Sequence, residues 1–477
     1  MSVSQSQVPE LMKLGQIPTD LEQRIDTDVL EPVIFTQSFC RFQLQNKGFL
    51  HSFSSIVLAL DAPGVAANRN ATLPVNVGIH SLIERASLKV GAQTICEIED
   101  FANYMGYKSM FIDNAINQER ESVISGRIMA HQLVYDTTSD TNAKTYTLDT
   151  NNYPLNDKAS PAGARLPSYS NSASFNEDGI PPKDNIILHN KPEFRVSLAD
   201  LFPFLRFNQL PLYMIDEPIS IELVWTPQSS DRRFCFPENG SVSERLDITQ
   251  TAVKLVADYI FYDGETMSSY ADANKVMNFN YVDYRLAKRT YGETDTSKQI
   301  LNVGGAGRIV NKVFMAMGLS DTGDSLMNDY VARGPSISGS NQGQLTYNVR
   351  YNDHFVYPID RKSSAIQFHD IVQTEANIPY ITREEYVASG IVGEGGGLTN
   401  QARGAYNGHS PSTDLVNRFN YQATRLNRNE RINSRGIEVE TTLSNAIGGG
   451  TDATMRCWIE LVRSATLDNG RMDIVYA

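Results

Sequence analysis

The N-terminal segment, residues 1–30, has a helical spacing of apolar positions. Three apolar residues recur every four positions: Leu21, Ile25 and Val29. Thr19-x-x-Glu22 has the form of a capping box ahead of this run, and Pro32 would end it. We therefore predict a short helical N-terminal arm over residues 1–30, with its helix from Thr19 to Leu30.

From residue 40 onward the dominant period changes to two. Apolar and polar residues alternate in several runs: Cys40–Leu44, Ala86–Val90, Ile219–Trp225, Leu255–Phe261, Leu345–Tyr351, Ile437–Leu443 and Cys457–Leu461. Such alternation predicts strands with one face on a core and the other in water. Turn pairs separate some of the runs: Asp263-Gly264, Asn407-Gly408 and Asn469-Gly470. The chain is therefore predicted to be all-β.

The strands fall into two halves, separated by a polar, turn-rich segment. Besides the arm, we predict three segments: a first β-sandwich at 31–226, a linker at 227–247 and a second β-sandwich at 248–477. Each sandwich carries a long polar insertion, at 136–185 and at about 390–411. The first insertion has only four Leu, Ile or Val residues in its length. It is too poor in aliphatic residues to build a core, so we expect it at the surface.

Composition narrows the possible functions. The 477 residues include 42 Lys or Arg and 55 Asp or Glu, for a net charge of −13. This acidic balance argues against a protein whose whole surface binds nucleic acid. No apolar run is long enough for a membrane-spanning helix, and residues 1–16 lack the apolar core of a secretory signal. The four cysteines show no CxxC spacing, so neither zinc nor a disulfide framework is predicted.

Sequence motifs for catalysis are not found. Gly448–Ala453 matches a G-x-G-x-x-A dinucleotide pattern, but it joins two strand runs and is better explained as a hairpin turn. There is no P-loop and no HExxH motif, and no two histidines have the spacing of a local metal pair. We predict no catalytic, cofactor-binding or metal-binding residues.

One basic cluster stands out on this acidic chain. Five arginines lie close together in the sequence, opposed only by Glu430: Arg418, Arg425, Arg428, Arg431 and Arg435. The cluster is either a contact surface for phosphate or an acidic neighbour, or a solvated face. Arginine favours an interface, because its planar guanidinium makes directional pairs with carboxylates.

Two stretches resemble a known family. The first is VGIHSLIERASLKVG at residues 77–91, and the second begins with FRVSLADLFPF at 194–204 and runs to the strand at 219–223. The motif positions of the second are Leu198, Phe202, Phe204, Asn208, Leu210, Pro211 and Leu212. Both stretches resemble the first jelly roll of double jelly-roll major capsid proteins, above all those of Polinton-like viruses, virophages and related eukaryotic DNA viruses. We expect Phe202 and Phe204, two positions apart, to enter one core.

The resemblance implies two consecutive eight-stranded jelly-roll β-sandwiches and a structural function. Trimers of such chains would form pseudo-hexameric, hexon-like capsomers that tile an icosahedral shell around a DNA genome. The implied partners are a homotrimer, neighbouring capsomers, and penton and minor capsid proteins, with no small-molecule substrate, cofactor or sequence-specific nucleic acid. The implied location is the virion, assembled inside the host cell.

Two alternatives stay open at this point. A jelly-roll carbohydrate-binding protein or glycoside hydrolase would need two carboxylates facing each other across a cleft with aromatic platforms. A tail fibre or minor structural subunit would share the all-β character without the trimeric capsomer. Screening for glycan activity tests the first alternative, and the native mass tests the second.

Overall fold

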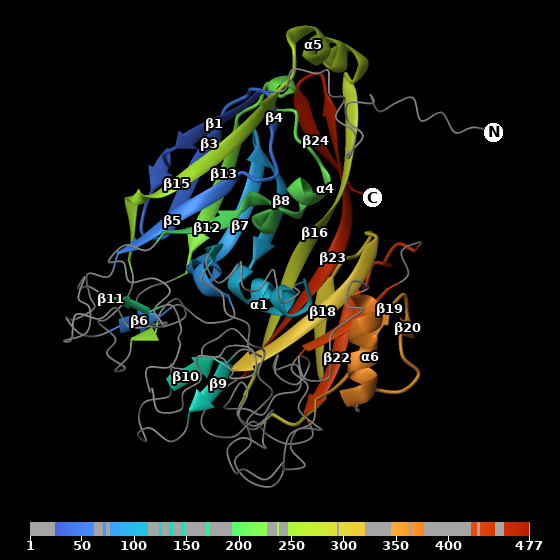
Figure 1. The fold of residues 1–477 in the computed structure, drawn as a ribbon. Coiled ribbons are helices and arrows are strands. Elements are labelled where there is room, and N and C mark those ends of the chain that lie inside the picture. Colours follow the sequence, from blue (N-terminus) through green and yellow to red (C-terminus); the bar gives the residue numbers. More distant parts are fainter. Residues whose placement is uncertain are drawn as a thin grey trace, which may run out of the picture.

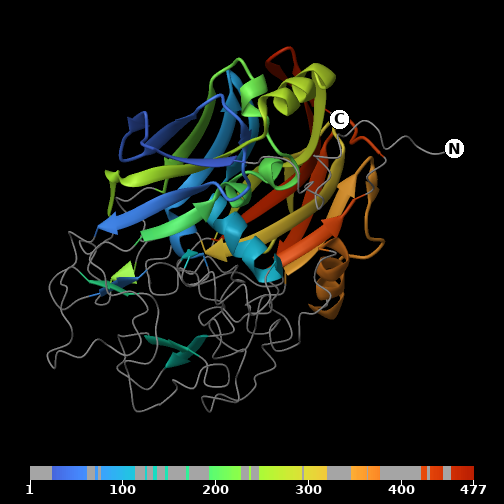
Figure 2. The same cartoon turned by 45° about the horizontal axis from the view of Figure 1, so that its top comes forward.

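The strands form two bodies that lie side by side (Figures 1 and 2). The computed structural model describes residues 24–61, 70–72, 77–112, 124–125, 133–136, 145–148, 168–170, 193–226, 236–237, 247–292, 295–319, 345–361, 364–375, 421–426, 430–443 and 453–476. The first body, blue to green in Figure 1, lies against the yellow and red strands of the second.

Two facing antiparallel sheets build the first half. One has the order β1 (Arg24–Leu30), β15 (Asp247–Phe261), β5 (Ser55–Asp61) and β12 (Glu193–Ser197), with β4 (Phe49–Leu50) also paired to β15. The other has the order β2 (Ile34–Phe35), β3 (Phe39–Leu44), β13 (Ile219–Trp225), β7 (Ile83–Val90) and β8 (Gln93–Glu99). The predicted alternation sets the register, because Ile221 pairs with Phe42 and Leu88, and all three are fully buried.

The strand order of the first half is that of a jelly roll. Its eight principal strands, lettered B to I along the chain, are β1, β3, β5, β7, β8, β12, β13 and β15. One sheet then reads B-I-D-G and the other C-H-E-F. We call these the first BIDG sheet and the first CHEF sheet.

The second half repeats this topology. Its BIDG sheet is β16 (Val276–Tyr291), β23 (Ala453–Asp468), β18 (Val310–Leu319) and β21 (Tyr421–Arg425), with β24 (Arg471–Tyr476) also paired to β23. Its CHEF sheet is β17 (Gln299–Gly304), β22 (Ile437–Leu443), β19 (Leu345–Tyr351) and β20 (His354–Phe355). Two consecutive jelly rolls are therefore present, although only alternation predicted the second.

The predicted helix over residues 24–30 is wrong. This segment is strand β1, and each of its residues pairs with a residue of β15. A spacing of four places Ile25 and Val29 on one side of a strand as well as of a helix. The open edge of β15 therefore decides between the two conformations. The capping box lies outside the described residues.

The predicted start of the second half at residue 248 is also wrong. Strand β15 pairs with β1 and β5, so it closes the first jelly roll. Asp263-Gly264 is not a hairpin turn. Asp263 caps α5 (Gly264–Ala273), where its Oδ1 accepts the Thr266 N–H at 2.8 Å. Alternation alone cannot distinguish the last strand of one sandwich from the first strand of the next.

Short elements complete the described structure. The helices are η2 (Gly78–Leu82), α1 (Phe101–Ile112), α3 (Leu198–Leu201), α4 (Pro203–Phe207), η4 (Leu212–Met214) and α6 (Ser364–Thr374). The further strands are β6 (Asn70–Thr72), β9 (Leu133–Asp136), β10 (Thr145–Leu148), β11 (Ser168–Ser170) and β14 (Phe236–Pro237). Apart from β10, β11 and Asp136, the insertion at 136–185 lies outside the described residues, as does all of the insertion at 390–411.

Candidate functional site

The motif residues of the capsid resemblance lie on the connection between β12 and β13. Ser197 caps α3, where its Oγ accepts the Ala199 N–H at 3.2 Å, and Pro203 takes the first position of α4, where an N–H is not needed. Most motif side chains are buried: Leu198, Phe202, Phe204, Leu210, Pro211 and Leu212. This connection therefore contributes core residues rather than a surface loop.

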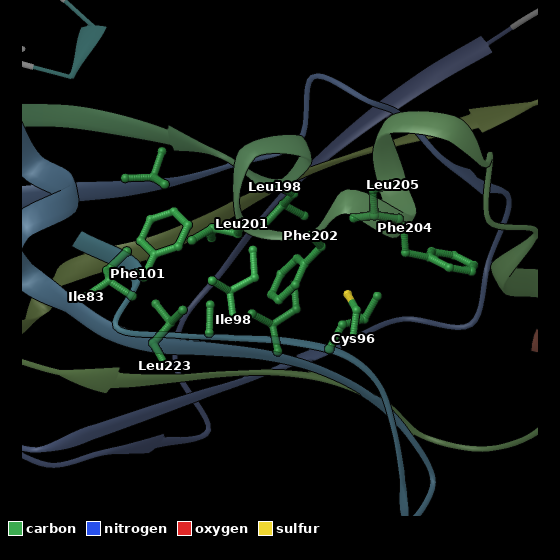
Figure 3. Close-up of a cluster of buried hydrophobic side chains, with 14 of the residues drawn as sticks. Ile83, Cys96, Ile98, Phe101, Leu198, Leu201, Phe202, Phe204, Leu205 and Leu223 are labelled. Carbon is green, nitrogen blue, oxygen red and sulfur yellow. The ribbon is translucent and has the colours of Figure 1, made fainter. Parts of the chain in front are cut away.

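Phe202 and Phe204 are both fully buried, but they point in different directions. In Figure 3, Phe202 lies toward Ile98 and Cys96 of β8, whereas Phe204 points away from them. The Phe204 ring meets Tyr281 of β16 edge-on, with 5.1 Å between ring centroids. Phe202 thus packs on β8 (Figure 3) and Phe204 on β16, and both belong to one continuous buried core, as their spacing predicted.

Asn208 also joins the two halves. Its side-chain Nδ2 donates to the Phe204 carbonyl at 3.1 Å and to the Asn280 carbonyl of β16 at 3.2 Å. The motif therefore serves the contact between β8, α1 and α4 of the first half and the second BIDG sheet. We call this contact the junction.

A buried carboxylate holds one end of the junction. Asp100 follows β8, and its Oδ2 lies 2.7 Å from Arg456 Nε of β23 and 2.8 Å from Lys288 Nζ of β16. Burial disfavours the charged carboxylate, but the two cations outweigh it and hold the pKa of Asp100 well below its usual range. The first half is thus tied to two strands of the second.

A second buried ion pair lies further along the junction. Arg463 Nη1 of β23 is 2.9 Å from Asp283 Oδ2 of β16, and the Glu97 N–H of β8 donates to Asp283 Oδ1 at 3.2 Å. Burial raises the pKa of Asp283, and Arg463 opposes that rise. Nearby, the Tyr281 hydroxyl donates to the Ile95 carbonyl at 2.7 Å.

A four-charge cluster lies where α1 meets the second half. Lys312 Nζ is 2.8 Å from Glu375 Oε2 and 3.4 Å from Glu460 Oε2. Lys108 Nζ of α1 is 3.8 Å from Glu375 Oε1 and 5.1 Å from the centroid of the Phe314 ring. Burial lowers the pKa of Lys108 to about 8, although Glu375 favours its charged form. Two cations and two anions thus balance in the interior.

These buried ions make the junction intolerant of change. A charge left without its partner inside a protein costs several kcal/mol, so the two halves cannot slide past each other without a large penalty. The Cys96 thiol at the junction is buried and its pKa is raised, so it is not activated as a nucleophile. The buried ion pairs of the junction therefore fix the position of one jelly roll against the other.

Sequence reasoning missed these charged residues, although some left a signal. Lys108 is the only charged residue in the otherwise apolar and small-residue segment Phe101–Ile112. A lone charge in so apolar a segment is a signal for a buried partner. Asp100, Asp283 and Glu460 gave no comparable signal, because their partners lie far away in the sequence.

The structure describes three residues of the predicted basic cluster. Arg425 is exposed on β21, and Arg431 is exposed on the segment that leads to β22. Arg435 Nη1 pairs with Asp353 Oδ1 at 2.6 Å, with both side chains more than half exposed. Arg418 and Arg428 lie outside the described residues. The role of this cluster as a contact surface stays a prediction.

The described part of the chain holds neither a candidate metal site nor a candidate membrane-spanning helix. None of its His, Cys, Asp and Glu residues form a group of three or more that could hold a metal ion. Its helices also lack the length and apolar character that a membrane span requires.

Comparison with known proteins gives similarity in structure alone. No family model and no curated protein sequence matches this chain. Among solved structures, it is similar to a chain of the PBCV-1 virus capsid, with a TM-score of 0.53, 10% identity, and 96% of this chain and 97% of that chain covered.

Two further structures give the same result. The Sputnik virophage structure matches with a TM-score of 0.52 and 12% identity, covering 98% of this chain and 92% of that chain. The Faustovirus major capsid protein matches with a TM-score of 0.51 and 10% identity, covering 95% and 92%.

The fold is therefore a double jelly roll, with two β-sandwiches of the same strand order in one chain. It is the fold of the major capsid proteins of DNA viruses and virophages, and the predicted fold class is confirmed. These structural neighbours are capsid components rather than enzymes.

Proposed function

We propose that this chain is the major capsid protein of a DNA virus. Three copies would assemble into a pseudo-hexameric capsomer, and capsomers would tile an icosahedral shell around the genome. Its partners would be its own copies, neighbouring capsomers, and penton and minor capsid proteins. It would be located in the virion after assembly inside the host cell.

The observation that carries the proposal is the rigid pairing of two jelly rolls of identical topology. A closed ring of six similar units needs each unit to meet the next in the same way. One chain already supplies two such units in a fixed relation, because buried ion pairs and aromatic contacts join them. Three chains would then supply six.

Electron microscopy of the purified protein tests the proposal. We expect class averages of particles with a pseudo-hexagonal outline and threefold symmetry. Particles showing only single two-lobed chains at micromolar concentration would contradict it. Hydrolysis of a glycan panel by the same preparation would support the glycoside hydrolase alternative instead.

A further inference from the structure

Buried charges are concentrated at the junction rather than inside the two jelly rolls. The described residues include ten buried Asp, Glu, Lys or Arg side chains, and seven of these lie at the junction: Asp100, Lys108, Asp283, Lys312, Arg456, Glu460 and Arg463. The other three, Glu222, Asp370 and Glu440, each pair with a cation of their own half. The contact between the halves therefore depends on ionised groups more than the two sandwich interiors do.

Asp100 neutralises the cations at one end of the junction. Besides its contacts with Arg456 and Lys288, its Oδ1 accepts a hydrogen bond from Asn103 Nδ2. Glu84 of β7 also approaches the Lys288 ammonium, at 3.9 Å. If Asp100 were protonated, Arg456, whose side chain is only 8% exposed, would lose this anionic partner in the interior.

Two carboxylates balance the lysines of the four-charge cluster. The Tyr107 hydroxyl donates to Glu375 Oε1 at 2.9 Å, and the Tyr284 hydroxyl donates to Glu460 Oε2 at 2.8 Å. Asn311 Nδ2 donates to Glu460 Oε1 at 3.0 Å. Burial alone would raise the pKa of Glu375 and of Glu460, but the two lysines and these donors outweigh it and hold both pKa values below their usual range.

Aromatic rings surround the four-charge cluster. Phe314 of β18 stacks on Tyr107 of α1 and on Trp458 of β23, with ring centroids 4.4 and 5.4 Å apart. Lys108 Nζ lies 5.1–5.8 Å from the centroids of four rings. A cation that loses its counter-ion in these surroundings can regain hydration only if the two halves separate.

The connection between the halves would permit such a separation. The described strands up to β15 pair only with one another, and so do those from β16 onward. The chain crosses between the two sets once, through α5, which has no buried residues (Figure 1). The two jelly rolls can therefore move apart on one tether while the sheets of each stay paired.

We propose that the junction is an acid-sensitive joint, which opens below about pH 4 and releases the two jelly rolls as folded, tethered units. All of the groups involved lie in one chain, so the joint does not depend on the proposed trimer. In the proposed capsid, its opening would alter the spacing of the two jelly rolls in every subunit, and acid would thereby loosen the shell. This last effect alone rests on the proposed function.

The direction of the pH effect follows from the carboxyl groups. Because the pKa values of Asp100, Glu375 and Glu460 are lowered in the closed junction, their stabilisation is complete above about pH 4 and is lost as the pH falls below it. Lys108, whose pKa is about 8, stays charged throughout this range. Asp283 acts in the opposite direction, because burial raises its pKa, so it does not drive the opening.

Tryptophan fluorescence during an acid titration tests the joint. Trp458 is fully buried at the junction, whereas Trp225 is buried in the first jelly roll. In the single-tryptophan chains Trp225→Phe and Trp458→Phe, we expect Trp458 emission to shift to longer wavelength with a midpoint between about pH 2 and 4. Trp225 emission and the far-ultraviolet circular dichroism should not change over that transition.

A charge-free cluster identifies the groups responsible. Replacing Lys108 and Lys312 with Met, and Glu375 and Glu460 with Gln, removes both signs of charge together. We expect this variant to open at a pH lower by about one unit or more, whereas the control Glu222→Gln, at a buried carboxylate outside the junction, should keep the wild-type midpoint.

Three results would overturn the proposal. Trp458 emission that is unchanged down to pH 2 would show that the junction is not acid-sensitive. Loss of the Trp225 signal and of the circular dichroism at the same midpoint as Trp458 would show global unfolding instead. A charge-free variant with the wild-type midpoint would show that these charges do not control opening. Each of these results would leave the oligomeric state at neutral pH, and with it the proposed function, unaffected.

Discussion

Replacing Phe204 with alanine should destabilise the protein through the junction. The ring is fully buried and lies 5.1 Å from Tyr281 and 5.6 Å from Phe279, centroid to centroid. Burial of a phenylalanine side chain contributes about 1.5–3 kcal/mol. Each aromatic contact adds about 0.5–1.5 kcal/mol. The loss should therefore be about 3–5 kcal/mol, as for other buried aromatics.

Urea unfolding followed by tryptophan fluorescence measures this loss. The chain has only two tryptophans, Trp225 in β13 of the first half and Trp458 in β23 at the junction. Single-tryptophan backgrounds therefore report the two sides separately. Because Phe204 joins them, we expect the unfolding midpoint to fall at both probes, at equal protein concentration.

Phe53→Ala is the matched control, because Phe53 is 77% exposed. It should change the free energy of unfolding by less than about 0.5 kcal/mol. If Phe204→Ala shifts the midpoint no more than Phe53→Ala does, the junction does not depend on this ring. A shift at Trp225 alone would show that the two halves unfold independently, against the rigid junction.

Three further predictions concern the buried charges and one turn. Asp100→Asn should lower the free energy of unfolding by about 3–5 kcal/mol at neutral pH. Because the pKa of Asp100 is depressed in the folded protein, its stabilisation is present above about pH 4 and is lost below it. In urea titrations the wild type should therefore lose more stability than the variant between pH 5 and 2. The pKa of Lys108 is lowered to about 8 in the folded protein, so above that pH the unfolded chain binds more protons at this residue than the folded one does. The free energy of unfolding, relative to that of Lys108→Met, should therefore rise by about 1 kcal/mol from pH 8 to 9. A difference between the two proteins that does not change with pH would contradict this. Gly470 has φ +83° and Gly307 has φ +71°, but only at Gly470 would a Cβ collide with a side chain, Asp216, so Gly470→Ala should lower the melting temperature more than Gly307→Ala.

Local pattern was enough to predict most of the strands. In β13, β19 and β22 the inward positions are mainly apolar and the outward positions are mainly polar, so a period of two is visible in the sequence. The Asn469-Gly470 pair predicted the turn between β23 and β24, and both residues have positive φ, as that turn requires. Such features depend on neighbours in sequence, which is why they could be predicted.

Features that depend on distant partners could not be predicted. The spacing of apolar residues at 24–30 fits a helix. These residues form a strand because they pair with the open edge of β15, which lies far away in the sequence. Both faces of β18 and β23 are buried in places, because one face meets the first half. Arg456 therefore occupies an interior position that alternation assigns to solvent, and only its pairing with Asp100 explains it.

Strand β1 in the N-terminal segment should stabilise the first jelly roll. A chain that begins at residue 31 lacks β1 and leaves β15 without its edge partner, so we expect faster proteolysis and a lower melting temperature. A chain that begins at residue 24 keeps β1 and is the control. Equal melting temperatures for the two chains would contradict a structural role for this strand.

The native mass of the purified protein is the most direct test of the central claim. If the chain is a major capsid protein built as proposed, native mass spectrometry at micromolar concentration and neutral pH should find three times the chain mass of 53.1 kDa. A single species at 53.1 kDa under those conditions would contradict the account.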